Sequence, residues 1–238
     1  MGHEAAFGGL VFWDHVTRKP RRTNVYVDGF NLYYGSLQDT KHKWLNLVAL
    51  AQRLLPDEQI QRVRYFSARV SGSASDPSSP ARQGKYLRAL DTLPEVTCHL
   101  GTFLSEDVKM RLAPPPDTGE ESWIMYLRPK GKRYAWVTKT EEKGSDVNLA
   151  TALLVDAFDG DMEYAVVISN DSDLMEPIRV VRARQCAVGV VNPHSRHGGE
   201  LAQVASWHRP LFTSYLRQSQ FPDTLTDERG DFSKPAGW

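Results

Sequence analysis

The chain has 238 residues, and its 29 Lys and Arg residues balance its 29 Asp and Glu residues. This length is sufficient for one large domain with a substantial core. The zero net charge excludes a global field that would attract nucleic acid or membranes, so any polyanion must be bound by local patches.

Residues 1–22 are expected to form an N-terminal extension. Its apolar run, Ala5–Trp13, is too short to cross a membrane and lacks the basic start of a signal peptide. Cys98 and Cys186 both lie in apolar, strand-like runs without metal-ligand spacing. These features predict a cytoplasmic protein with reduced, buried thiols and no membrane partner.

Strand and helix patterns alternate through residues 23–216, which we interpret as the main domain. The predicted strands are residues 23–29, 61–67, 95–104, 165–168 and 186–191. The predicted helices are residues 46–55, 81–93, 145–158, a segment after residue 173, and 201–205. This alternation predicts a Rossmann-like three-layer α/β/α fold with a mostly parallel central sheet.

Two further segments complete the predicted organisation. Residues 105–138 are expected to be an insertion with a hairpin-like pair of short strands, 123–127 and 134–138. Residues 217–238 turn polar, with Pro and Gly, and are expected to form a mobile C-terminal tail.

Four aspartates are predicted to meet at one rim of the sheet. Asp28 ends the first strand, Asp171 and Asp173 follow the strand 165–168, and Asp146 begins a helix. Ligands of open α/β sheets bind outside the carboxyl ends of the strands. Asp is also a preferred helix N-cap, so Asp171 and Asp173 also have a purely structural interpretation.

Clustered carboxylates repel one another unless a positive group lies among them. Oxygen ligands suit hard cations, which predicts Mg²⁺ or Mn²⁺ at Asp28, Asp146, Asp171 and Asp173. A metal-bound water could then attack a phosphodiester.

Three motifs carry a family resemblance. Val27–Asn31 (VDGFN), Glu142–Val147 (EKGSDV) and Ile168–Asp173 (ISNDSD) occur in this order. Together they resemble the NYN domain family, a branch of the PIN-like nucleases, from about residue 23 to residue 216. The resemblance implies a PIN-like fold, metal-dependent RNA cleavage by the four aspartates, and a catalytic-site position for Asn31. The family often has Gly where this chain has Asn170 in the third motif.

The prediction from sequence is therefore a metal-dependent endoribonuclease with an RNA substrate. A homo-oligomer or a regulatory protein partner is left open. The alternatives are a non-catalytic RNA-binding or assembly module and a phosphatase-type enzyme, although Phe30 stands where one common phosphatase family has a second acid. A dinucleotide-binding role is disfavoured because no glycine-rich loop follows the first strand.

Several further residues are candidates for contacts with substrate. Those proposed to bind it are Asn170, Lys143, Arg82, Lys85 and Tyr33. Other basic candidates are Arg88, Arg128, Lys130, Lys132 and Arg133, and other aromatic candidates are Tyr34, Trp123, Tyr126, Tyr134 and Trp136. Each has a simpler interpretation as a solvated or packing side chain. Asp156 is interpreted as supporting Asp146 or as a solvent-facing or capping acid. A zinc site at His194 and His197 is disfavoured because no further ligand pair accompanies them.

Overall fold

The computed structural model describes residues 19–72, 76–112, 134–194 and 199–238. A seven-stranded sheet with the order β4-β3-β2-β1-β5-β6-β7 forms the centre, and only β4 runs antiparallel to its neighbour. Its strands are β1 (Arg22–Asp28), β2 (Gln59–Ala68), β3 (Val96–Arg111), β4 (Tyr134–Lys143), β5 (Tyr164–Ile168), β6 (Ala187–Asn192) and β7 (Trp207–Pro210). The predicted mostly parallel sheet is confirmed.

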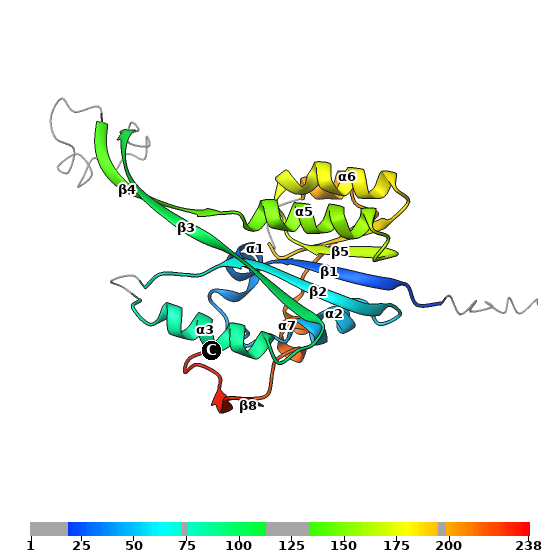
Figure 1. Ribbon diagram of the computed structural model, residues 1–238, viewed down its shortest axis with the longest axis horizontal. Helices are drawn as coiled ribbons and strands as arrows, with labels where there is room; N and C mark the ends of the chain where they lie inside the picture. The colour runs from blue at the N-terminus through cyan, green and yellow to red at the C-terminus, as the bar shows by residue number, and fades with distance from the viewer. Residues whose placement is uncertain (1–18, 73–75, 113–133, 195–198) are drawn as a thin grey trace, which may run out of the picture.

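Helices cover both faces of this sheet, which gives three layers (Figure 1). The helices are α1 (Gly29–Leu32), α2 (Leu47–Leu54), α3 (Ser79–Leu90), α5 (Ser145–Phe158), α6 (Met175–Ala183) and α7 (Thr213–Gln218). Short segments are the π-helix η1 (Tyr33–Leu37) and the 3₁₀ turns η2 (Ser172–Leu174) and η3 (Glu200–Gln203). Helices α2, α3 and α7 pack on one face, whereas α5 and α6 pack on the other. The predicted Rossmann-like three-layer fold is confirmed.

Strands β1, β5 and β6 lie in the middle of the sheet and bury mostly apolar side chains on both faces. Val166 and Ile168 belong to the core beneath α2, and Ala165 and Val167 to the core beneath α5 and α6. A strand covered on both faces requires such a continuous apolar run. The parallel register pairs Val27 of β1 with Ile168 of β5, so the two strands end side by side.

Strands β3 and β4 form a long two-stranded arm that projects away from the body (Figure 1). The prediction ended the third strand at residue 104, but β3 continues to Arg111 and pairs with β4 as far as Tyr134. Most side chains beyond residue 103 are exposed, so an apolar-run criterion could not follow the strand. Residues 113–133, including the predicted strand 123–127, lie outside the described residues.

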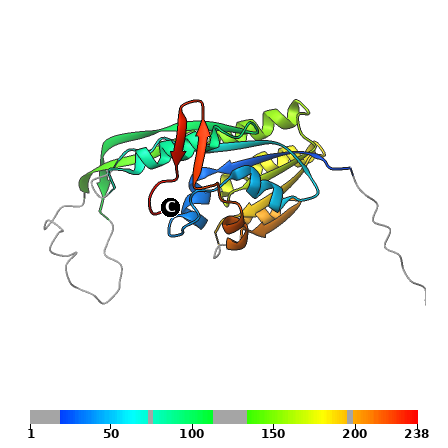
Figure 2. The same ribbon diagram turned by 90° about the horizontal axis from the view of Figure 1, so that it is seen from below.

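The C-terminal segment is folded, which corrects the prediction of a mobile tail. Strands β8 (Thr224–Asp227) and β9 (Gly230–Ser233) form a hairpin that lies beside α3 (Figure 2). Arg88 of α3 donates two hydrogen bonds to the carboxylate of Asp227 and lies over the ring of Phe232. Aromatic side chains such as Phe232 pack this segment against the domain, although its average composition is polar. A prediction from composition alone was therefore wrong.

In the described part of the chain, no helix is long and apolar enough to cross a membrane.

Candidate functional site

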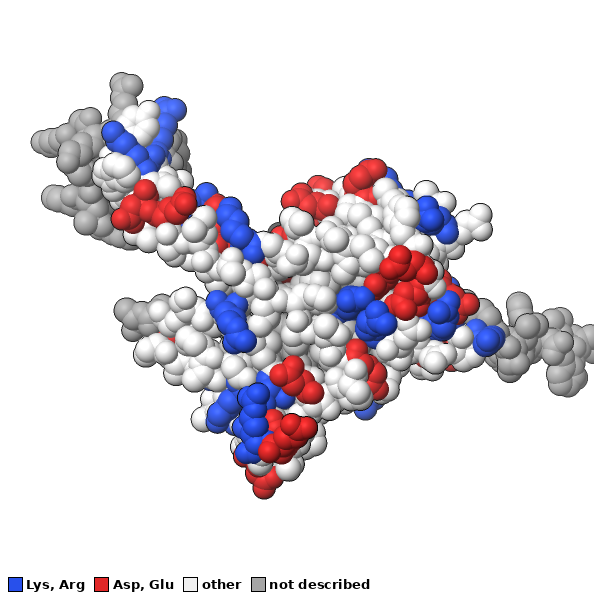
Figure 3. Space-filling view, viewed as in Figure 1, with Lys and Arg blue, Asp and Glu red and all other residues white. Residues whose placement is uncertain are grey.

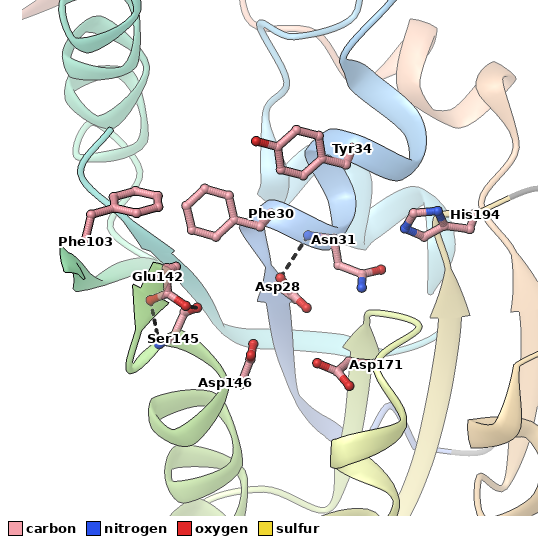
Figure 4. Close-up of a pocket in the computed structure, with 10 residues that line it drawn as sticks. All are labelled: Asp28, Phe30, Asn31, Tyr34, Phe103, Glu142, Ser145, Asp146, Asp171 and His194. Atoms are coloured by element: carbon pink, nitrogen blue, oxygen red, sulfur yellow. Dashed lines mark hydrogen bonds between the residues drawn. The ribbon is translucent and has the colours of Figure 1, made fainter. Parts of the chain in front are cut away.

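Successive strands are added towards opposite edges of the sheet on the two sides of the β1–β5 pair. From β1 the chain proceeds through β2 and β3 towards one edge, and from β5 it proceeds through β6 and β7 towards the other. Such a switch point leaves a crevice outside the carboxyl ends of the strands. Asp28 and Asp171 flank this crevice, and Asp146 enters it from the start of α5 (Figure 4). The structure therefore brings three of the four predicted acids together.

Asp28 is the most buried of these acids, with 4% of its surface exposed. Its Oδ1 accepts a hydrogen bond from the backbone N–H of Asn31 at 3.0 Å, which caps α1. Its Oδ2 accepts a hydrogen bond from the hydroxyl of Ser169 at 2.8 Å. Burial raises the pKa of Asp28 above its ordinary value, although these hydrogen bonds oppose the shift.

A second set of hydrogen bonds fixes the turn after β5. The Asn31 Oδ1 atom accepts from the backbone N–H of Asn170 at 3.0 Å, which ties the turn to α1. Asp171 caps η2 by accepting from the backbone N–H of Asp173 at 2.9 Å. The structural interpretation of Asp171 as a cap is thus confirmed, and Asp28 proves to be a cap as well.

The start of α5 is held by Glu142, a residue to which the sequence interpretation gave no role. Its carboxylate accepts hydrogen bonds from the backbone N–H of Ser145 at 3.0 Å and from the Ser145 hydroxyl at 2.7 Å (Figure 4). Gly144 makes the turn with φ of +103°, which favours glycine. The acid three residues before the helix start was a signal that could have revealed this turn.

Asp146 differs from the other three acids at the pocket. Among the described residues it has no hydrogen-bond partner, and it is exposed at the pocket mouth, where its carboxylate points towards Asp28 and Asp171 (Figure 4). Loss of solvation, followed by the charges of Asp28 and Asp171, raises its pKa from 3.8 to about 6. A carboxylate with this pKa can exchange a proton near neutral pH.

Aromatic side chains form the wall opposite the acids. The cavity has a volume of about 400 Å³, and Phe30, Tyr34 and Phe103 line it together with the acidic residues. Phe30 meets Phe103 edge to face at 5.8 Å between centroids and stacks beside Tyr34 at 6.4 Å. Phe103 comes from the arm, so its place in the pocket depends on a strand register that the sequence did not reveal. This wall offers flat apolar surface to a planar ring.

His194 completes the lining at the end of β6 (Figure 4). Its backbone N–H donates to Asn192 Oδ1 at 2.8 Å. A Cβ at Gly35 would lie 2.8 Å from the His194 ring, so η1 can approach the ring only with glycine at this position. His194 therefore lines the pocket, whereas His197, its partner in the disfavoured zinc motif, lies outside the described residues.

Other predicted site residues do not line this pocket. Asp173 is exposed, Tyr33 is exposed and packs against Tyr34, and Lys143 pairs with Glu141 at 2.7 Å. Asn170 contributes its backbone N–H as described, and its buried Oδ1 has no partner in the described structure. No group of three or more Asp, Glu, His or Cys side chains within the described ranges is arranged to hold a metal ion.

On the face shown in Figure 3, Lys and Arg side chains lie interspersed with Asp and Glu side chains. Arg82 pairs with Asp76 and Arg88 with Asp227, both on the side of α3. Lys85 lies on the same helix, is exposed and does not line the pocket. Tyr134 and Trp136 are exposed on the arm. The remaining candidates, Trp123, Tyr126, Arg128, Lys130, Lys132 and Arg133, lie outside the described residues.

Asp156 proves to be structural. It is buried beneath α5, where it accepts two hydrogen bonds from Arg64, at 2.9 and 2.7 Å, and one from the Tyr26 hydroxyl at 2.6 Å. These contacts form a buried polar network in the core and do not reach the pocket lining. Neither its predicted support of Asp146 nor its predicted exposure to solvent is observed.

A comparison with known proteins shows a similarity in sequence along most of the chain. The chain is 29% identical over 245 aligned residues to the 6-hydroxy-3-succinoylpyridine 3-monooxygenase HspA of Pseudomonas putida, covering 92% of this chain and 76% of that protein. The crystal structure of a protein of unknown function from Vibrio parahaemolyticus matches 82% of this chain and 95% of its own, with a TM-score of 0.48 and 12% identity. No family model matches the chain.

The monooxygenase relative contradicts the predicted function. The predicted ribonuclease, its hydrolase class and its Mg²⁺ or Mn²⁺ cofactor are therefore wrong, as are the alternatives of an RNA-binding module and a phosphatase. A physical reason for the error is that N–H and O–H donors of the protein already compensate part of the charge of Asp28, Glu142 and Asp171, which the sequence argument assigned to a cation. The NYN resemblance and the RNA partner are tested by none of these proteins and stay predictions.

Proposed function

We propose that this chain is an oxidoreductase that adds one oxygen atom to a small aromatic substrate bound in the pocket between β1, β5 and α5. The observation that carries this proposal is the 29% identity to a monooxygenase along 92% of the chain. By its name, that relative acts on a hydroxylated pyridine with a succinoyl substituent.

The pocket supports an aromatic substrate. A planar ring can lie against Phe30 and Phe103 while its polar edge meets the carboxylates on the opposite side (Figure 4). Ligand pockets commonly have volumes upward of about 300 Å³, and this cavity, at about 400 Å³, lies in that range. Apolar walls with a few polar groups at one end fix the orientation of such a ligand.

The overall reaction requires dioxygen and two electrons. One oxygen atom becomes a hydroxyl group on a ring carbon, the other is reduced to the level of water, and a reduced nicotinamide or a reduced flavin supplies the two electrons. The group displaced from that carbon leaves without its bonding electrons, as a proton where the carbon carries hydrogen, or to water as a carboxylic acid where it carries an acyl group.

A flavin nucleotide does not fit the described lining of this pocket. Its phosphates would need a glycine-rich turn, a free helix N-terminus or basic side chains. Here Asp28 caps α1, Glu142 occupies the start of α5, and neither Lys nor Arg lines the cavity among the described residues. We therefore place no flavin in the pocket, and the reductant acts from solution or from another component.

Within this scheme Asp146 accepts a proton from the hydrogen-bonding edge of the ring. Its pKa of about 6 leaves it mostly ionised at pH 7.5 yet basic enough to take a proton. Removal of that proton makes the ring more electron-rich, which favours its attack by an electrophilic oxygen species. The negative charges of Asp28 and Asp171 raise the proton affinity of Asp146. Phe30 and Phe103 contact the face of the substrate ring and fix its orientation.

The test is oxygen transfer to the substrate named by the relative. Purified protein is incubated with 6-hydroxy-3-succinoylpyridine, NADH or NADPH, and FMN or FAD, under ¹⁸O₂. We expect substrate loss and a product carrying one ¹⁸O atom. General acid–base groups contribute at least about a hundredfold in rate, so Asp146→Asn should reduce turnover by about that factor while the circular dichroism spectrum is unchanged.

Glu176→Gln is the matched control, since Glu176 is an exposed acid in the first turn of α6 and lies outside the pocket. This variant should keep the turnover of the unmodified protein. Absence of oxygen uptake with every combination of reductant and flavin would overturn the proposed function. Equal loss of activity in both variants would overturn the role of Asp146.

We also propose a cytoplasmic location, supported by the two free cysteines, Cys98 and Cys186.

A further inference from the structure

The four carboxylates at the pocket are unequal in their capacity to bind a ligand. Asp28 and Glu142 each accept two hydrogen bonds from the protein, and Asp171 accepts one as a cap. Asp146 accepts none among the described residues and points into the cavity (Figure 4). It is therefore the carboxylate whose hydrogen-bonding capacity is left for a ligand.

The surroundings of Asp146 determine which ligand edge can approach it. Asp28, Asp171, Asp173 and Glu142 all place negative charge near its carboxylate. An anionic group would be repelled there, whereas an N–H donor or a positive charge would be attracted. His194 is the basic side chain of the described lining, and the picture places it on the far side of Asn31 from Asp146 (Figure 4).

The aromatic wall restricts the shape of the ligand. Phe30 and Phe103 present ring surface within the same cavity as Asp146. A flat ring that lies against this surface can also reach Asp146 with a hydrogen-bonding group only if that group lies in the ring plane, at the edge of the ring. The faces of these aromatic rings carry partial negative charge, which also favours an electron-poor or cationic ring.

We propose that Asp146 is the specificity-determining residue of the pocket and that it selects nitrogen heteroaromatic rings that present an N–H group, neutral or cationic, over anionic rings. This inference rests on the proposed function in that the same pocket holds the substrate. It goes beyond that function by naming the ring edge that is recognised and the carboxylate that recognises it.

The test is a binding measurement that does not require turnover. Affinities of 2-pyridone, N-methyl-2-pyridone and benzoate are measured by calorimetry at pH 7.5 for the unmodified full chain. We expect 2-pyridone to bind at least about tenfold more tightly than its N-methyl analogue, the typical difference when a hydrogen bond to a charged acceptor is lost. Benzoate should bind more weakly than both neutral rings.

Two variants assign the effect to Asp146. Asp146→Asn should abolish most of the preference for 2-pyridone and should improve benzoate binding, because a negative charge is removed. Asp159→Asn, at the opposite end of α5, should leave all three affinities unchanged. Thermal unfolding of each variant confirms that a change in affinity does not reflect loss of folding.

The outcomes separate this inference from the proposed function. Equal binding of the two pyridones, or a preference that survives in Asp146→Asn, would overturn the specificity inference even if oxygen transfer is observed. A preference that disappears in Asp146→Asn would support it even if no oxygen transfer is found, and the function alone would then fail.

Discussion

Replacing Asp146 with asparagine should stabilise the protein at neutral pH. The pKa of this residue rises from 3.8 to about 6 on folding. The folded state therefore holds the proton more tightly, and the stability that this provides is fully present below pH 3.8 and lost as pH rises through about 6. Above that pH, ionised Asp146 opposes folding.

The magnitude follows from the size of the shift. Each pKa unit corresponds to about 1.4 kcal/mol, so the shift sets an upper bound of about 3 kcal/mol. Because Asp146 is exposed at the pocket mouth, solvent screens the repulsion. We therefore expect Asp146→Asn to raise the free energy of unfolding by about 1 kcal/mol at pH 7.5, which is about 2–4 °C in Tm for a protein of this size.

The assay is urea and thermal denaturation of both proteins between pH 4 and pH 8. The stabilisation should be largest above pH 7 and should shrink towards zero near pH 4, where both side chains are uncharged. Glu176→Gln provides a contrast of opposite sign, because Glu176 lies in the first turn of α6 and pairs with Arg179 at 3.1 Å, and both interactions are stabilising. Destabilisation by Asp146→Asn at pH 7.5, or a gain that persists undiminished at pH 4, would refute the electrostatic reasoning.

Two further substitutions test the core, and a third tests helix propensity. Arg64→Met should lower the free energy of unfolding by about 3 kcal/mol in urea, because it leaves Asp156 buried without its charged partner; a loss below 1 kcal/mol would show that the neutral donors suffice. Gly189→Ala should cost about 1–3 kcal/mol by calorimetry, since its Cβ would lie 2.1 Å from the Trp207 ring. Gly84→Ala, in α3 where a Cβ meets open space, should instead stabilise by about 0.5–1 kcal/mol; loss of stability there would contradict the helix-propensity argument.

The sequence predicts the central layers well because their signals are local. Strands β1, β5 and β6 are apolar runs that end at turn residues, and that pattern alone indicates buried parallel strands. Strand β7, with the sequence WHRP, was missed because four residues of mixed polarity carry no periodic signal. The outer half of β3 was missed because its stability comes from pairing with β4 across a long separation in sequence.

The site was predicted in position but not in chemistry. Fold class alone places Asp28, Asp146 and Asp171 at one rim, as the structure shows. A carboxylate at this rim can bind a cation or accept a hydrogen bond from a backbone N–H. The conformation of the local turn decides between the two, and the sequence motif does not reveal that conformation. Phe103 could not be assigned at all, because its contact with Phe30 requires the path of a strand that is distant in sequence.

The aromatic contacts of the C-terminal segment have a consequence for synthesis of the chain. Trp44, 1% exposed, packs its ring against Phe221, Phe232 and Trp238. During translation, Trp44 leaves the ribosome long before these three partners have been made. At typical elongation rates of about 5–20 residues per second, this half of the core remains incomplete for about ten seconds or more. A nascent chain stalled before residue 221 would expose that apolar surface, and chaperones bind such surfaces.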